Sequence, residues 1–241
     1  MGRLTKKESK LHQQALDMVF GSDKKLNFDE KEFIFKNYAG DGIISTGAFF
    51  TPFGLAFDFT LDGSIPQGGS CIEFCSGIGV LSYAMSCRYQ PKRLVCVELN
   101  QEYSRIGKRL VPWAEWLCMD AFQYQIGERF DIVISNPPFG NNVNTSTAFH
   151  GQYTGTEFEY KIIEYGARFS DFGAFILPQS SSGFVYSGSR RGFHVAETSK
   201  FQKFTRETGI ELMPGCGIDT GIYRDQWHGA SPVCEVVTVE Y

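Results

Sequence analysis

The sequence predicts an α/β protein built on a doubly wound, mostly parallel sheet. Short runs of β-branched and aromatic residues alternate with segments of helical periodicity across residues 70–178. A glycine-containing turn, residues 76–79, joins the first strand-like run to the next helical segment, as in sheets that bind nucleotides. The tail, residues 233–241, forms one more strand-like run, and we expect it to pair antiparallel with a strand near residues 210–213.

The predicted elements follow one another without an internal repeat or a long low-complexity linker, which favours a single domain over residues 1–241. Two amphipathic helices, over residues 4–20 and 28–38, form an N-terminal helical extension (1–42) ahead of the core (43–241). In the core we expect strands over residues 71–75, 93–98, 113–119, 131–134 and 172–177, and helices over 80–87, 101–109 and 157–169.

Composition bounds the possible partners and compartment. The chain has 241 residues, of which 42% are hydrophobic and 21% charged, enough for one α/β domain with a full core. Its net charge of −4 gives no general attraction to nucleic acid or an anionic membrane, so nucleic-acid binding would need a local basic patch. The absence of a long apolar run and of a signal-peptide core favours a cytoplasmic protein without membrane contact.

Cysteine usage gives no indication of a metal site. The seven cysteines are scattered, and Cys71, Cys96 and Cys234 lie in apolar strand-like runs, as reduced core thiols of a cytosolic protein do. Cys71 and Cys75 are the closest pair, and no second pair follows at zinc-finger spacing. We therefore expect no metal.

The strand at residues 131–134 stops at an unusual corner, Asn136-Pro137-Pro138-Phe139. The two prolines prevent continuation of a strand or a helix. The corner sets an amide and an aromatic ring beside carbonyls that have no N–H neighbour, an arrangement suited to binding a planar amino group. Alternatively, the prolines simply end the strand and Phe139 fills the core.

Acidic residues and glycines at the ends of the first three strands suggest a nucleoside-containing cofactor. Glu73 precedes Gly77 and Gly79, which would let a ligand approach the backbone, although a third glycine is missing. Glu98 ends the next strand, where a carboxylate can accept both hydroxyls of a ribose. Asp120 follows the third strand and could accept from an adenine amine, or it could cap a helix.

A further turn, Phe50-Thr51-Pro52, precedes a helical segment that starts near Leu55. A Thr-Pro turn can direct a hydroxyl and backbone donors at a carboxylate. The alternative is a proline at a helix N-terminus beside buried aromatic rings.

These motifs, in this order, resemble the S-adenosylmethionine-dependent adenine-N6 DNA methyltransferases whose cofactor motifs precede the catalytic Asn-Pro-Pro-Phe. The resemblance covers about residues 43–178 and implies a Rossmann-like sheet of the class I methyltransferase type, with S-adenosylmethionine as cofactor. The usual acidic glycine motif is here Glu-Phe-Cys-Ser-Gly-Ile-Gly. About sixty residues follow the fifth strand, too few for a separate large target-recognition domain.

The resemblance also implies residue roles. The catalytic residues would be Asn136, Pro137, Pro138 and Phe139, with Asn136 and the Pro137 carbonyl accepting from the amine and Phe139 stacking on the flipped base. The cofactor-binding residues would be Phe50, Thr51, Pro52, Glu73, Cys75, Gly77, Gly79, Glu98, Leu99, Asp120, Ala121 and Asn136. Thr51 would hold the methionine carboxylate, Glu98 the ribose hydroxyls, and Leu99 the adenine ring.

The predicted reaction is methyl transfer from S-adenosylmethionine to the exocyclic N6 amine of adenine in DNA. An RNA adenine or a protein glutamine amide is an alternative acceptor. A nucleotide-binding module or an NAD-dependent oxidoreductase is an alternative of a different class, but the missing third glycine and the unexplained Asn136 corner argue against it.

Two polar segments that follow strand ends, residues 141–156 and 179–206, are expected to select the target base. Alternatively, a protein partner supplies target recognition. Arg190, Arg191, Lys200 and Lys203 lie among aromatic residues in the second segment and are our predicted nucleic-acid-binding residues. The alternative for the lysines is the solvated face of an amphipathic helix over residues 198–207.

Overall fold

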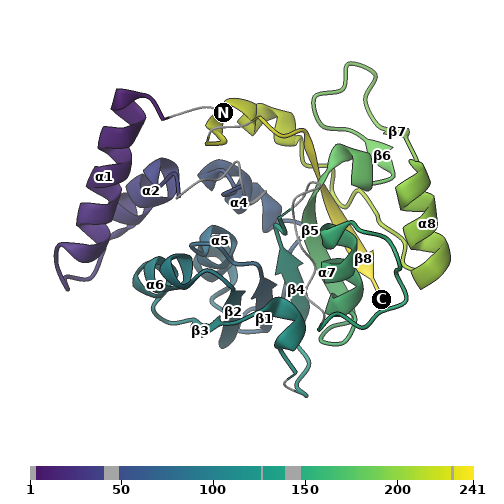
Figure 1. Cartoon of the computed structure of the whole chain (residues 1–241), viewed down its shortest axis with the longest axis horizontal. Helices are drawn as coiled ribbons and strands as arrows, with labels where there is room; N and C mark the ends of the chain where they lie inside the picture. The colour runs from purple at the N-terminus through teal and green to yellow at the C-terminus, as the bar shows by residue number, and fades with distance from the viewer. Residues whose placement is uncertain (1–3, 41–48, 126, 139–147, 229–230) are drawn as a thin grey trace.

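A computed structural model describes residues 4–40, 49–125, 127–138, 148–228 and 231–241. Its centre is a six-stranded sheet, with the N-terminal helices at one end of the molecule and α8 (Ser199–Thr208) at the other (Figure 1). The strand order is β3-β2-β1-β4-β5-β8. The strands are β1 (Ser70–Phe74), β2 (Arg93–Glu98), β3 (Glu115–Cys118), β4 (Ile132–Ser135), β5 (Phe172–Pro178) and β8 (Cys234–Glu240).

The first five strands of this sheet are parallel, and β8 runs antiparallel beside β5. From β1 the chain continues on one side to β2 and β3, and it then crosses to β4 and β5 on the other side. This reversal of direction creates a crevice outside the carboxyl ends of β1 and β4, where ligands bind in open α/β sheets. The prediction of a doubly wound, mostly parallel sheet is confirmed.

Alternation along the strands divides the core into two layers. On β1, Cys71 packs toward one face of the sheet, while Ile72 and Phe74 pack toward the other. The first face is covered by α2 (Phe28–Asn37), α4 (Phe53–Phe59), α5 (Val80–Tyr89) and α6 (Gln101–Leu110); the second is covered by α7 (Phe158–Gly166) and α8. Both faces are buried, which explains the continuous apolar runs of these strands.

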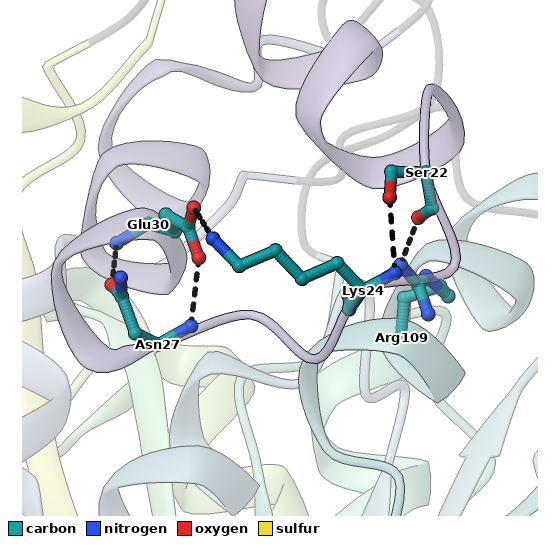
Figure 2. A network of polar contacts seen from close by, with 5 residues as sticks. All are labelled: Ser22, Lys24, Asn27, Glu30 and Arg109. Carbon is teal, nitrogen blue, oxygen red and sulfur yellow. Dashed lines mark hydrogen bonds and ion pairs between the residues drawn. The ribbon is translucent and has the colours of Figure 1, made fainter.

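The N-terminal extension begins with α1 (Lys6–Phe20), followed by α2, and both helices start at capping boxes. Figure 2 shows how the connection between them is held to the core. The Arg109 guanidinium, from α6, donates to the carbonyls of Val19 (3.1 Å), Ser22 (2.5 Å) and Lys24 (3.1 Å). Lys24 in turn pairs at 3.2 Å with Glu30, which forms the capping box of α2 together with the N-cap residue Asn27. The extension therefore packs against α6 and contributes to the same core as the sheet.

The C-terminal strand does not have the partner that we expected. It pairs with β5 along its whole length, from Phe172 opposite Glu240 to Pro178 opposite Cys234. The predicted partner region contributes only one isolated bridge, between Met213 and Thr238. Without β8, the outer edge of the buried strand β5 would have unpaired backbone groups, and a seven-residue apolar strand satisfies them.

A short ribbon of strands and three 3-10 helices complete the carboxyl edge of the sheet. A two-stranded antiparallel ribbon joins β6 (Phe184–Val185) to β7 (His194–Val195). The 3-10 helices η2 (Gln179–Ser181) and η3 (Thr220–Gln226) follow β5 and precede β8, and η1 (Ala121–Gln123) follows β3. Among the residues that the structure describes, no helix combines the length and apolar character of a membrane span.

Candidate active site

The predicted motifs meet at the carboxyl ends of β1 and β4, the point where the strand order reverses. Phe74 at the end of β1 lies opposite Ser135 at the end of β4. The Ser135 hydroxyl donates to the Phe74 carbonyl at 2.6 Å, which ties the two strand ends together. The glycine turn after β1 and the Asn136 corner after β4 therefore lie side by side.

The Asn136 side chain has a fixed orientation. Its Nδ2 group donates to the carbonyl oxygen of Phe49 at 2.8 Å and to Oγ1 of Thr51 at 2.9 Å. Because a backbone carbonyl can only accept, the atom facing Phe49 must be the nitrogen, and the amide cannot be reversed. Both N–H donors are used, and Oδ1 points elsewhere.

Oδ1 of Asn136 is buried and has no hydrogen-bond partner among the described residues. A buried acceptor without a donor costs about 1–3 kcal/mol, so native proteins rarely keep one without a reason. The atom lies at the carboxyl edge of the sheet, beside the glycine turn. It is placed to accept a hydrogen bond from a ligand.

The Phe-Thr-Pro turn links the corner to the glycine turn. Within this turn the Thr51 side chain is buried, and Pro52 directly precedes the first residue of α4. The ring of Phe50 packs edge-on against Tyr103, 5.1 Å between centroids, and lies over Gly77, where a Cβ atom would come within 3.2 Å of the ring. Three motifs that are far apart in the sequence thus form one contiguous site.

Glycine is required at two positions of the turn after β1. Gly77 and Gly79 have φ angles of 55° and 85°, and a Cβ atom on Gly79 would approach the Trp116 ring to 2.8 Å. Cys75 also has a positive φ, 57°, although it is not glycine. Such strain, about 1–3 kcal/mol, concentrates at ligand sites. Burial raises the pKa of the Cys75 thiol, so it stays protonated and is no nucleophile.

Glu98 at the end of β2 joins the glycine turn to α6. Its Oε2 accepts the N–H of Gly77 and its Oε1 the N–H of Asn100, both at 2.7 Å. Each carboxylate oxygen keeps a second lone pair, so a diol can still be bound. Burial raises the pKa of the Glu98 carboxyl, against the backbone hydrogen bonds that lower it. The next side chain, Leu99, is 70% exposed and free to cover an aromatic ring.

Glu73 is placed differently from our expectation. Its carboxylate is buried and accepts from the backbone N–H (3.1 Å) and the hydroxyl of Ser82 in α5, so it faces away from the open side of the turn. Burial raises the pKa of the Glu73 carboxyl to about 8, against the lowering effect of the Ser82 hydrogen bonds. Since it holds the start of α5, we no longer assign it to the lining of a ligand.

Asp120 shows the capping role that the sequence left open. Its Oδ1 accepts the N–H of Phe122 at 2.9 Å at the start of η1, and the neighbouring Ala121 is buried. A cofactor contact through the other oxygen stays a prediction for this residue. Phe139 lies outside the described residues, as does the segment 141–147 of the predicted base-selecting loop.

The four predicted nucleic-acid-binding residues fall into two pairs. Lys200 and Lys203 lie on α8 within 3.9 Å of Glu159 and Glu207, as expected for the face of an amphipathic helix. Arg190 and Arg191 are exposed in the connection between β6 and β7, and neither forms an ion pair with a described residue. The two arginines are therefore the better candidates for phosphate contacts.

The site depends on two groups that sequence reasoning missed, the carbonyl of Phe49 and the side chain of Ser82. The first fixes the Asn136 amide and the second holds Glu73. Phe49 directly precedes the Phe-Thr-Pro turn, but nothing in its residue type indicates a role for its carbonyl. Ser82 occupies the position of the missing third glycine, which was a usable signal.

Comparisons with known proteins agree with this geometry. A family model described as Methyltransferase small domain matches residues 59–152, and no curated protein matches the sequence. A type I restriction-modification methyltransferase subunit from Streptococcus thermophilus aligns with a TM-score of 0.59 at 16% identity, over 92% of this chain and 50% of that one. This chain thus spans about half the length of that subunit.

Two other solved structures are similar over most of this chain. A putative class I S-adenosylmethionine-dependent methyltransferase from Listeria monocytogenes aligns with a TM-score of 0.53 at 13% identity, over 97% of this chain and 68% of that one. A putative RNA methyltransferase from Pyrococcus horikoshii aligns with a TM-score of 0.52 at 17% identity, over 88% and 96%. The fold is that of the class I methyltransferases. Together with the matched family model, it implies S-adenosylmethionine as the cofactor.

The residues at the site fit this cofactor. Gly77 and Gly79 allow the left-handed backbone of the turn, Glu98 retains acceptor capacity for hydroxyls, and the exposed Leu99 can cover a base. Among the described residues, no group of three or more His, Cys, Asp or Glu side chains is arranged to hold a metal ion.

The hold of Thr51 on Asn136 can be tested with two substitutions. Thr51→Val keeps the shape but removes the Oγ1 acceptor, so the amide loses part of its orientation, and we expect turnover to fall about tenfold, the equivalent of one hydrogen bond. Thr51→Ser keeps the hydroxyl and should retain most of the turnover. Steady-state kcat decides, and equal losses in both variants would contradict the assigned hydrogen bond.

Glu73 gives a pH dependence of stability. The folded-state pKa of the Glu73 carboxyl, about 8, lies above its unfolded value. Its contribution to the free energy of unfolding is therefore fully present below about pH 4.5 and is lost as pH rises through 8. Glu73→Gln cannot ionise and should become progressively more stable than the wild type between pH 5 and 8, by up to about 1.4 kcal/mol per pH unit. Urea unfolding across this range measures the difference, and a constant difference would refute the shift.

Proposed function

We propose that this protein transfers a methyl group from S-adenosylmethionine to the exocyclic N6 amine of adenine in DNA. The observation that carries the proposal is the buried Oδ1 of Asn136, which has no hydrogen-bond partner among the described residues. Phe49 and Thr51 hold its amide beside the glycine turn. An acceptor in this position suits an amino group with two N–H bonds.

The Asn136 corner can activate such an amine. In adenine the nitrogen lone pair is conjugated with the ring, which makes the amine a poor nucleophile. Oδ1 of Asn136 and the carbonyl of Pro137 would accept the two N–H bonds, drawing the nitrogen toward tetrahedral geometry and freeing the lone pair. When bound, S-adenosylmethionine supplies an electrophilic methyl group on a cationic sulfur. A side-chain nucleophile is not needed.

Other residues of the chain would position the two reactants. Thr51 and its neighbours Phe50 and Pro52 would hold the methionine end of the cofactor, and Gly77, Gly79, Glu98 and Leu99 the nucleoside end. Phe139 would stack on the target base once it leaves the duplex, at a cost of about a few kcal/mol. In this assignment the Asn136 amide touches the substrate, Phe49 acts only through that amide, and Thr51 orients the amide in addition to its contact with the cofactor.

DNA is our first choice of substrate because the Phe-Thr-Pro turn and the Asn-Pro-Pro-Phe corner resemble DNA adenine methyltransferases. The similarity in fold to a methyltransferase subunit of a restriction-modification system is compatible with it. RNA is the second candidate, since a putative RNA methyltransferase aligns over nearly its whole length. Base selection would come from segment 179–206 or from a protein partner.

Asn136→Ala tests the proposed activation. Removal of the acceptor should lower methyl transfer by about 100-fold or more, by analogy with the loss of one positioned transition-state hydrogen bond. Binding of S-adenosylhomocysteine, measured by calorimetry, should change little because the substitution leaves the glycine turn intact. Asn37→Ala, on α2 of the extension, is the matched control and should keep full activity. Near-normal turnover of Asn136→Ala would exclude amine activation by this residue.

A further inference from the structure

A polar pocket of about 280 Å³ opens at the carboxyl end of β5, on the same edge of the sheet as Asn136. Its walls are the chain that follows β5 and the helix η3. They include Gln179, Ser187, Ser189, Thr220, Gly221 and Arg224. None of these residues belongs to the predicted cofactor site.

The pocket has a rigid wall. Glu235, buried at the start of β8, accepts from the backbone N–H groups of Tyr186 (2.8 Å) and Ser187 (2.9 Å) and from the side chain of Gln179 (2.7 Å). Asp219 accepts from the N–H groups of Gly188 and Gly221, both at 2.9 Å. These hydrogen bonds hold the two chain segments that line the pocket in place. Both carboxylates are occupied by hydrogen bonds from backbone N–H groups.

The helix η3 connects the pocket to the active site. Tyr223 packs on Gly54 at the start of α4, where a Cβ atom would come within 2.6 Å of the ring, and its hydroxyl bonds to Asp58. Helix α4 begins directly after the turn that contains Thr51, and Thr51 accepts a hydrogen bond from Asn136. β4 and β5 are adjacent strands, and Ser135 lies opposite Phe175, so β5 runs three residues, about 10 Å, beyond the end of β4 before the pocket begins at Gln179.

The positive charge at the pocket is not neutralised by ion pairs within the described residues. Arg224 lines the pocket, and Arg190 and Arg191 follow Ser189 at its rim; all three are exposed and form no ion pair there. By contrast, Arg129 pairs with Asp171, and Arg93 with Glu115 and Glu128. Asp225 is the exposed carboxylate nearest to Arg224 in sequence.

We propose that this pocket binds a backbone phosphate of the nucleic-acid substrate, with Arg224 as the main contact and Arg190 and Arg191 along the rim. The guanidinium group matches a phosphate with two parallel N–H donors, and its charge is permanent. A phosphate held on the same edge of the sheet as the corner would fix the strand on which the target adenine lies. The inference rests on the proposed function, and it adds Arg224 and the pocket to it.

Fluorescence anisotropy with the full chain and saturating S-adenosylhomocysteine tests the pocket. The probes are a labelled DNA duplex, the same single strand, and an RNA of the same sequence, each titrated at several salt concentrations. Arg224→Gln should weaken binding about tenfold and reduce the slope of log K against log salt by about one. Arg190→Gln/Arg191→Gln should reduce the slope by about two. The probe that is bound most tightly identifies DNA or RNA as the source of the phosphate.

Arg129→Gln is the matched control, because this arginine already pairs with Asp171 and lies ahead of the amino end of β4, at the opposite edge of the sheet, and it should change the affinity less than twofold. Arg224→Lys keeps the positive charge but lacks the planar guanidinium, so its affinity for the probe should lie between those of the wild type and Arg224→Gln. If Arg224→Gln behaves like the Arg129 control while the wild type still methylates adenine, the pocket is refuted and the proposed function stands. If the wild type binds none of the probes, the pocket is also refuted, and adenine methylation is judged separately by its own assay.

Discussion

The arrangement of the site depends on the two hydrogen bonds that the Asn136 amide donates to Phe49 and Thr51. They tie the end of β4 to a turn 85 to 87 residues earlier in the chain, and that turn lies in contact with the glycine turn after β1. Both donors are satisfied internally, and the amide oxygen, which has no partner within the described part of the chain, is left for a ligand. One planar group thereby sets the relative positions of the acceptor, the glycine turn and the start of α4.

Two buried carboxylates stabilise the other side of the crevice, and they do so in different ways. Glu98 bridges the glycine turn and the start of α6 through backbone donors and keeps acceptor capacity toward the crevice. Glu73 faces the start of α5, and burial favours its neutral form in the folded state. Glutamates at the ends of two adjacent strands therefore both accept hydrogen bonds from nearby backbone N–H groups. Of the two, Glu98 is the one that can also bind the hydroxyls of a nucleoside.

Much of the fold could be predicted because apolar runs and helical periodicity alternate so regularly between Ser70 and Pro178. The partner of β8 could not be predicted, because pairing with either candidate strand would bury the apolar residues of β8. Only the assembled sheet shows that the outer edge of β5 lacked a partner strand. At the site, local motifs located the glycine turn and the Asn136 corner. The orientation of Glu73 and the hold on Asn136 arise from contacts between distant segments, which residue types alone do not encode.

We propose that the Asn136 corner presents an adenine amine for methylation, and the chemical identity of the methylated product tests this most directly. DNA and RNA free of N6-methyladenine would be incubated with the protein and methyl-labelled S-adenosylmethionine, then digested for nucleoside mass spectrometry. We expect labelled N6-methyladenosine, with the deoxyribose form from DNA as the main product. Label confined to another base or to protein, or no transfer to any nucleoside, would contradict it.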